Sequence, residues 1–174
     1  MEWIVQILAH TPWWVFAIFA LLIYRAVRAT RPNVTSLWRM AVIPGILTLW
    51  SLAGLAERTA PDTRALLAWI VSLAVGAAIG WLMLRGVAVR ADHARGLVWR
   101  PGDWSYPPLV LAIFVVKYAF GYMSAVEPSR LLDPGFRLAE IMTSGVITGV
   151  FVGKFTLCML KYRAAPSETL EAGS

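Results

Sequence analysis

The sequence predicts an all-α fold, a polytopic integral membrane bundle of five transmembrane helices, from two observations. Of its 174 residues, 59% are hydrophobic and 15% are charged, whereas soluble domains carry about 25% charged residues. Long uncharged stretches also recur along the chain, and about 20 apolar residues are enough to cross the roughly 30 Å of hydrocarbon in a bilayer. We expect a single transmembrane domain over residues 1–163, with spans at about 12–28, 37–56, 64–84, 107–126 and 136–162.

The first span is expected to begin at Pro12, because Thr11 and Pro12 are typical of an N-cap followed by proline at the first helical position. Residues 2–9 would then form a short segment at the membrane interface. The alternative is one helix from Trp3 that kinks at Pro12. A cleaved signal peptide is not expected, because the N-terminus has no basic region and no small-residue cleavage site.

Glycine and proline shape the middle spans. In the second span, Pro44 lacks a backbone donor and predicts a kink. Small residues on one face of a helix let two backbones approach closely in lipid, so we expect a glycine zipper in the fifth span that packs within the bundle. The third-span glycines offer a face through which two copies of the chain could dimerise. The glycines concerned are Gly76 and Gly80 in the third span, and Gly145, Gly149 and Gly153 in the fifth.

The placement of arginine and lysine orients the bundle, since short cytoplasmic loops carry an excess of these residues. One set of span ends has ten flanking cations and the other has four, which puts the N-terminus outside and the C-terminus in the cytoplasm. The net charge of +6 is therefore explained by topology, and no nucleic-acid partner is expected. The larger set is Arg25, Arg28, Arg31, Arg39, Arg85, Arg90, Arg95, Arg100, Lys161 and Arg163, and the smaller is Arg58, Arg64, Arg130 and Arg137.

The longest connection, RGVAVRADHARGLVWRPGDWSYPP, joins the third and fourth spans. Apolar and polar residues alternate in VAVRA and GLVWR, which predicts a short cytoplasmic β-hairpin. Its arginines either bind anionic lipid headgroups, at about 1 kcal/mol each near a negative leaflet, or only fix the topology of a solvated loop. Residues 164–174 are small and polar, so they are expected to form a disordered cytoplasmic tail.

One lysine interrupts the fourth span in the stretch LAIFVVKYAFGY. Lys117 lies about nine residues, or about 14 Å, beyond the start of that span, which is near the bilayer midplane. A lysine at the centre of a helix costs about 2.5–3.5 kcal/mol on insertion scales. We therefore expect Lys117 to face the bundle interior or a wet cavity, with a partner.

Three kinds of partner are open for Lys117. Glu140 is the only carboxylate expected inside a span, and it would form a bridge across two helices. A ligand or a proton site would instead use the ammonium group functionally. In the third case the ammonium group would be satisfied by water or by hydroxyl groups such as those of Tyr118, Tyr122, Ser144 and Thr148.

A second lysine, Lys154, lies in the fifth span, about 10 Å before Lys161. The simplest interpretation is an anchor whose ammonium group reaches the cytoplasmic headgroups. Lys117 and Lys154 nevertheless fall at comparable depth, and two facing cations would need an anion between them or a lowered pKa on one of them. The candidate ligand-binding residues are therefore Lys117, Glu140, Tyr118, Tyr122 and Lys154.

Motifs for catalysis or cofactor binding are missing from the sequence. His10 and His93 are expected on opposite sides of the membrane, so they cannot share a haem or a metal. Cys158 is the only cysteine, and there is no glycine-rich phosphate loop and no G-x-S-x-G. We expect no enzyme activity, no catalytic residues, no metal and no cofactor.

Two stretches, TPWWVFAIFALLIYRAVRATRP and WRPGDWSYPPLVLAIFVVKYAFGY, resemble a family of small five-helix inner-membrane proteins of proteobacteria. That family is a domain of unknown function, distantly similar to the CcdC type. The resemblance includes an aromatic-lysine stretch, here Phe114, Lys117 and Tyr118. It implies a multi-pass protein of the bacterial inner membrane with no established activity.

Two functions follow as hypotheses. The first is a small membrane protein that binds or transports a small anion, or a proton-coupled solute, at a midplane site around Lys117. The alternative is a non-transporting scaffold or assembly subunit that packs with partners through its glycine faces. The expected partners are the lipid bilayer, anionic headgroups at the cytoplasmic arginines, and either a second copy of the chain or another membrane subunit.

Overall fold

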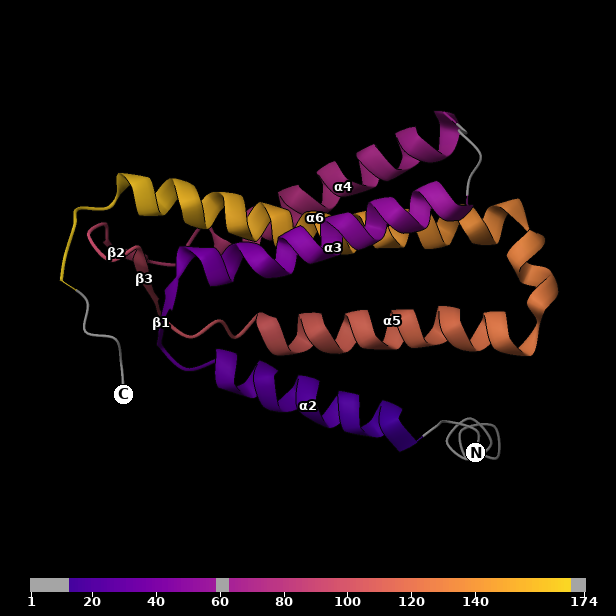
Figure 1. Cartoon of the computed structure of the whole chain (residues 1–174), viewed down its shortest axis with the longest axis horizontal. Helices are drawn as coiled ribbons and strands as arrows, with labels where there is room; N and C mark the ends of the chain where they lie inside the picture. The colour runs from indigo at the N-terminus through magenta and orange to yellow at the C-terminus, as the bar shows by residue number, and fades with distance from the viewer. Residues whose placement is uncertain (1–12, 59–62, 170–174) are drawn as a thin grey trace.

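A computed structural model describes residues 13–58 and 63–169, and this part of the chain is mostly helical (Figure 1). A short 3-10 helix, η1 (Pro128–Leu132), joins the last two long helices. The helix ends that lie inside the described ranges fall within two residues of the ends of the spans expected from the sequence. The long helices are α2 (Trp13–Ala29), α3 (Leu37–Arg58), α4 (Thr63–Leu84), α5 (Tyr106–Val126) and α6 (Pro134–Ala164).

Four of the described helices, α3 to α6, are long and apolar enough to cross a membrane. Large apolar side chains cover their outer faces, as in α3, where Leu49 and Trp50 are 70% and 77% exposed. These features are compatible with a membrane protein. The described part of α2 has 17 residues, and residues 2–9 and the start of the first span at Pro12 lie outside the described residues. The count of five crossings and their orientation stay predictions.

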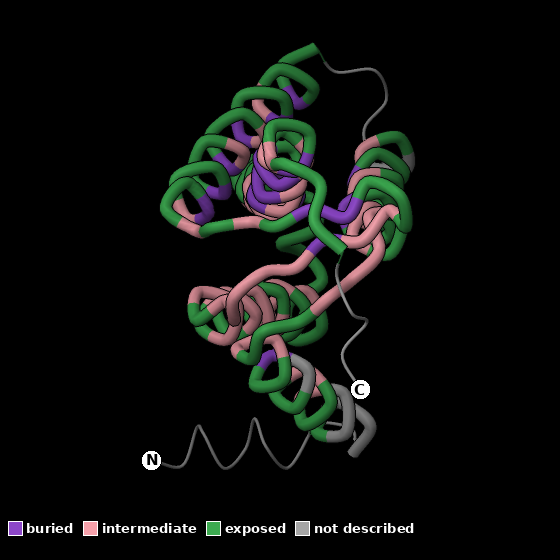
Figure 2. The backbone as a smooth tube through the Cα atoms, turned by 90° about the vertical axis from the view of Figure 1, so that its left-hand side faces the viewer, coloured by how far each residue is buried: buried purple, intermediate pink, exposed green. Residues whose placement is uncertain are grey.

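The helices form two groups, which Figure 2 shows one above the other. In the first group α4 packs along α6, and α3 lies beside α6. In the second group α2 packs on α5, with the rings of Phe19 and Phe114 centred 4.7 Å apart. Close contacts between the two groups are few along the described helices. A seam between the α3–α4–α6 group and the α2–α5 pair therefore runs along the molecule.

The close contact between α4 and α6 depends on glycine. A Cβ atom at Gly149 would collide with the carbonyl oxygen of Leu73, and one at Gly76 would collide with that of Val146. Small residues allow this approach of two backbones in lipid, where packing rather than the hydrophobic effect holds helices together. The face with Gly76 and Gly80 is covered by α6 of the same chain. The expectation that this face serves a dimer is therefore wrong.

A three-stranded antiparallel sheet lies at one end of the helices (Figure 1). The expected hairpin is present as β2 (Arg90–Asp92) and β3 (Leu97–Arg100), and its turn is closed by a bond from the backbone N–H of Arg95 to Asp92. The third strand, β1 (Asn33–Ser36), comes from the connection between α2 and α3 and pairs with the other edge of β3. The partner of β1 lies more than 60 residues away, so no local hairpin signal in the sequence indicates this strand.

The sheet packs against the ends of α4 and α6. Ala91 and Val98 of the sheet are buried in one cluster with Leu84, Leu157, Cys158 and Tyr162. The ammonium group of Lys161 donates to the carbonyl oxygens of Leu84, Arg85 and Val87, at 3.0, 2.8 and 2.6 Å. These are carbonyl groups at and just after the end of α4, which have no partner within the helix.

The first residues of the expected disordered tail also contact the sheet. Ser167 forms a parallel bridge with Ala91, and the backbone N–H of Glu168 donates to the carbonyl of Ala91 at 2.8 Å. The side chain of Ser167 accepts from the backbone N–H of His93. Residues 170–174 lie outside the described residues.

Candidate functional site

A large cavity in the described part of the chain lies in the seam, at the end that carries the sheet. It has a volume of about 520 Å³ and is bounded by α2, α3, α6, the start of α5 and the connection from β3 to α5. Its lining includes five cations and one carboxylate, and we call it the basic cavity. The charged lining residues are Arg28, Arg31, Arg39, Arg100, Lys154 and Asp103.

Local structure gathers the four arginines at this end. Arg28 lies in the last turn of α2, Arg31 follows it in the connection to β1, and Arg39 lies in the first turn of α3. Arg100 is far from the other three arginines in the sequence, but the pairing of β1 with β3 places it opposite Asn33. The strand that the sequence does not indicate is thus the element that brings Arg100 to the other three.

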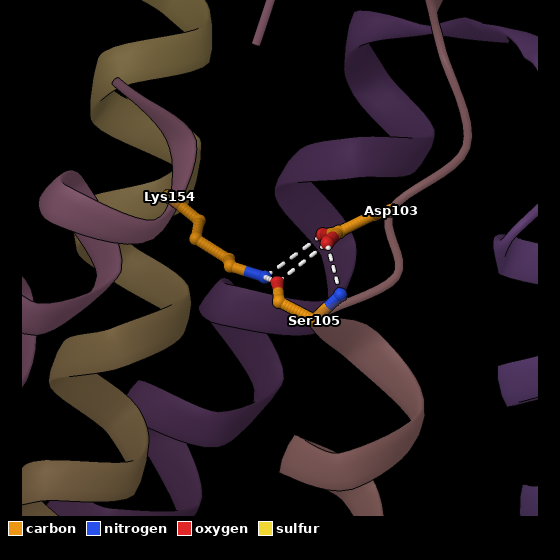
Figure 3. Close-up of polar contacts among 3 residues, drawn as sticks. All are labelled: Asp103, Ser105 and Lys154. Carbon is orange, nitrogen blue, oxygen red and sulfur yellow. Dashed lines mark hydrogen bonds and ion pairs between the residues drawn. The ribbon is translucent and has the colours of Figure 1, made fainter. Parts of the chain in front are cut away.

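Lys154 lines the basic cavity and forms an ion pair with Asp103 (Figure 3). Its ammonium group donates to a carboxylate oxygen of Asp103 at 2.8 Å and to the hydroxyl of Ser105 at 2.9 Å. Asp103 in turn accepts from the backbone N–H of Ser105 at 3.0 Å. Lys154 is 7% exposed, so it is not an interfacial anchor that reaches the headgroups.

Backbone contacts hold Asp103 in place for this pair. The N–H of Asp103 donates to the carbonyl of Ala29 at the end of α2, at 2.9 Å. The preceding residue, Gly102, lies so close to the carbonyl of Thr30 that a Cβ atom there would collide with it. The segment before α5 is therefore clamped between the end of α2 and the side chain of Lys154.

Two opposing effects act on the pKa of Asp103. Burial raises the pKa, but the hydrogen bonds from Lys154 and Ser105 and the positive charge of Lys154 together outweigh it. The pKa of this carboxyl therefore lies below its ordinary value. Asp103 is ionised near neutral pH, and its charge is matched by Lys154.

The arginines are then the cations that an added ligand can use. The planar guanidinium of arginine matches carboxylate and phosphate oxygens with two parallel hydrogen bonds. Arg28, Arg31 and Arg39 are exposed and Arg100 is half-buried. A cavity with these side chains is suited to an anion.

A second, smaller cavity lies farther along the same seam and contains Lys117 (the midspan cavity). Its volume is about 100 Å³, which is room for a few water molecules. Lys117 of α5 and Glu140 of α6 both line it, so the structure brings these two predicted site residues together. Hydroxyl groups complete its polar lining: the indole N–H of Trp69 donates to Ser51 at 2.8 Å, and Ser51 lies 3.1 Å from Ser144.

The other predicted residues lie elsewhere. Tyr118 and Tyr122 belong to a row of rings along α5, in which the ring centres of Tyr118 lie 6.0 Å from Phe114 and 6.5 Å from Tyr122. Neither tyrosine lines the basic cavity or the midspan cavity. Lys154 lines the basic cavity and Lys117 the midspan cavity, so the two lysines do not face each other and the condition for an anion between them is not met.

Sequence reasoning missed Asp103 and the role of the arginines around it. Asp103 follows a Pro-Gly turn and precedes Ser105 by two positions, a pattern typical of a carboxylate that accepts from the backbone near the start of a helix. That pattern was available in the sequence. The arginines were interpreted either as topology signals or as a surface for anionic headgroups, but nothing in their spacing shows that β1 pairs with β3 and places them around one cavity.

Comparison with known proteins gives a family without an activity. The model of DUF6622, a family of unknown function, matches residues 2–167. The chain therefore belongs to this family, which confirms the expectation of an uncharacterised family. No curated protein and no solved structure matches the chain, and the match gives no link to the CcdC type.

Proposed function

We propose that this member of a family of unknown function is an integral membrane protein that binds an anion in the basic cavity. The role is binding rather than catalysis. It keeps the hypothesis of an anion ligand, but it moves the centre of the site from Lys117 to the sheet end of the seam.

One observation carries the proposal. Four arginines line a single cavity in which Asp103, the one carboxylate among the described lining residues, is already paired with a lysine 2.8 Å away. Several like charges in one place repel one another in the free protein, and an anion relieves this repulsion. The cavity volume of about 520 Å³ also lies within the range of about 300–1,000 Å³ that is common for ligand pockets.

Binding of anions to the purified chain tests the proposal. The protein, in nanodiscs of zwitterionic lipid, would be titrated with inorganic phosphate, with citrate and with anionic lipid, while tryptophan fluorescence and thermal stability are followed. The double variant Arg39→Gln/Arg100→Gln should lower the affinity for every anion that binds. Arg85→Gln/Arg95→Gln is the matched control, because it removes two charges at the same end but outside the cavity. If no anion binds, or if both double variants lower affinity equally, the proposal fails.

A second function is favoured by the midspan cavity. Lys117 and Glu140 share it with two serine hydroxyls at the depth of the apolar spans, and ionisable residues inside a membrane commonly mark proton or ion pathways. We infer a proton-coupled transport role for this cavity. Proton flux into liposomes containing the protein, driven by a potassium diffusion potential, is the readout. Lys117→Met and Glu140→Gln should each abolish the flux without unfolding the protein, and Tyr122→Phe, outside the cavity, should not.

A scaffold without transport makes the opposite prediction for the same residues. Lys117→Met would then lower stability, and the double variant with Glu140→Gln would recover it, with no proton flux in any form. The faces with Gly76 and Gly149 pack against each other within the chain, so a scaffold would have to use other surfaces for its partners. The observed packing therefore favours the binding role.

The proposed location is the inner membrane of a bacterium, with the sheet end in the cytoplasm. The support is the excess of arginine at the helix ends beside the sheet. Single cysteines placed at Ser167 and at Ser129, in a Cys158→Ser background, test this orientation in intact cells. A membrane-impermeant thiol reagent should label position 129 alone, and labelling of position 167 alone would reverse the topology.

A further inference from the structure

The lining of the basic cavity changes from charged to apolar along the helices. Arg28 and Arg39 lie at the helix ends beside the sheet, whereas Leu21 and Ile43 line the cavity farther from that end. At 1.5 Å per residue, Leu21 lies about 10 Å along α2 from Arg28, and Ile43 lies about 6 Å along α3 from Arg39. On α6, Phe151 lies farther from the sheet than Lys154 and continues the apolar part. A small soluble anion would use only the charged end of such a cavity.

The apolar part is open toward the side of the bundle. Leu21 and Ile43 are 52% and 45% exposed, and they lie on helices that face lipid in the proposed arrangement. Helices α2 and α3 make few contacts with each other, because α2 packs on α5 and α3 on α6. A hydrocarbon chain can therefore enter the cavity from the bilayer between α2 and α3 without displacing a packed helix contact.

We infer, on the basis of the proposed anion-binding function, that the ligand is an anionic diacyl phospholipid. Its phosphate lies among Arg28, Arg31, Arg39 and Arg100, and an acyl chain runs along Leu21 and Ile43. Paired with Lys154, Asp103 adds no uncompensated negative charge that would repel the phosphate. The ion pair also fixes the segment before α5 as one wall of the headgroup site.

The test separates the lipid from its headgroup. Purified, delipidated protein in a neutral detergent is titrated with phosphatidylglycerol, with phosphatidylcholine of the same chains, and with glycerophosphoglycerol, the headgroup without chains. Native mass spectrometry counts bound molecules, and tryptophan fluorescence gives the affinity. We expect one tightly bound phosphatidylglycerol per chain, with weaker binding of the other two.

Two variants identify the site. Arg28→Gln/Arg39→Gln should weaken the binding of phosphatidylglycerol about 25-fold, since two cation contacts are lost and each is worth about fivefold. The matched control Arg85→Gln/Arg95→Gln should change it little. Ile43→Gln should lower the affinity for phosphatidylglycerol but leave the affinity for glycerophosphoglycerol unchanged. Circular dichroism of each lipid-free variant shows whether it is folded.

The outcomes distinguish this inference from the proposal beneath it. Equal affinity for phosphatidylglycerol and glycerophosphoglycerol, both lowered by Arg28→Gln/Arg39→Gln, would overturn the lipid assignment and leave anion binding in place. Equal binding of the anionic and zwitterionic lipids, unchanged in every variant, would mean a non-specific lipid shell and overturn the inference. If no anion responds to the arginine variants, both fail.

Discussion

Replacing Lys154 with methionine removes the ammonium group from the buried ion pair and keeps most of the side-chain volume. In the folded protein this group donates to Asp103 at 2.8 Å and to Ser105 at 2.9 Å. The side chains of the pair are 9% and 15% exposed. Water screens such a pair weakly, so the variant tests whether the pair holds the segment before α5 to α6.

The expected magnitude follows from the geometry. Two unit charges 2.8 Å apart attract by about 6 kcal/mol at an effective dielectric constant of about 20. The cost of removing both charges from water offsets part of this attraction, and loss of one partner of a buried pair commonly costs about 3–5 kcal/mol. Asp103 lies near the protein surface and can regain some hydration, so we expect Lys154→Met to cost about 3 kcal/mol.

Unfolding in mixed micelles measures this cost as a free energy, and a thermal scan should show a loss of roughly 6–12 °C. Asp103→Asn should lower stability by a similar amount, because it leaves the ammonium group without a charged partner. The double variant should cost less than the sum of the two single changes, with a coupling of about 2 kcal/mol.

The pH dependence of the same pair has a defined sign. The pKa of Asp103 is lower in the folded protein than its ordinary value, because the bonds from Lys154 and Ser105 and the lysine charge outweigh the effect of burial. A group with a lowered pKa contributes its full stabilisation above its unfolded pKa of about 3.9 and loses it as the pH falls through the folded value. The cost of Lys154→Met should therefore be equal at about pH 8 and about pH 6, and it should shrink below about pH 4.

An exposed ion pair serves as the control. Arg130 and Glu127 lie 2.6 Å apart, but both side chains are about half exposed. Because water screens this pair, Arg130→Gln should cause no measurable change in stability. The reasoning is refuted if Lys154→Met costs no more than Arg130→Gln, or if the costs of Lys154→Met and Asp103→Asn add without coupling.

Two further changes probe the helix contacts by thermal unfolding in the same micelles. Gly149→Leu should lower the unfolding temperature by roughly 6 °C or more, from about 3 kcal/mol of steric overlap with α4. Gly121→Leu, where a Cβ meets nothing within 4 Å, should not, and equal losses would contradict the assigned contact. Lys161→Met should cost about 2 kcal/mol by leaving the carbonyls at the end of α4 without their charged donor. Arg163→Met, exposed in the same turn, should change stability little, and a similar effect of both would count against this role.

The helices could be predicted from the sequence because their signals are local. Runs of apolar residues and the prolines and polar residues at their ends place the described helix boundaries within two residues. The hairpin of β2 and β3 was also accessible, since alternation and the turn at Gly96 lie within one short segment. Strand β1 was not, because its four residues become a strand only through pairing with β3, more than 60 residues away.

The site depends on this long-range pairing, and so it was only partly predictable. A contact between Lys117 and Glu140 was one of three alternatives, because charges inside a membrane need partners, and both residues line the midspan cavity. Lys154 was recognised as unusual, but its partner Asp103 lies in a connection that periodicity does not place. The basic cavity arises from the fold as a whole: β1 brings Arg100 to the ends of α2 and α3, and no local pattern encodes that meeting.

An experimental structure of the protein in anionic lipid nanodiscs tests the central claim most directly. We expect one phosphate-sized density within hydrogen-bonding distance of Arg39 and Arg100, continuous with an acyl chain beside Ile43. Arginine side chains turned away from the cavity toward bulk water, with ordered lipid bound only elsewhere on the bundle, would contradict it.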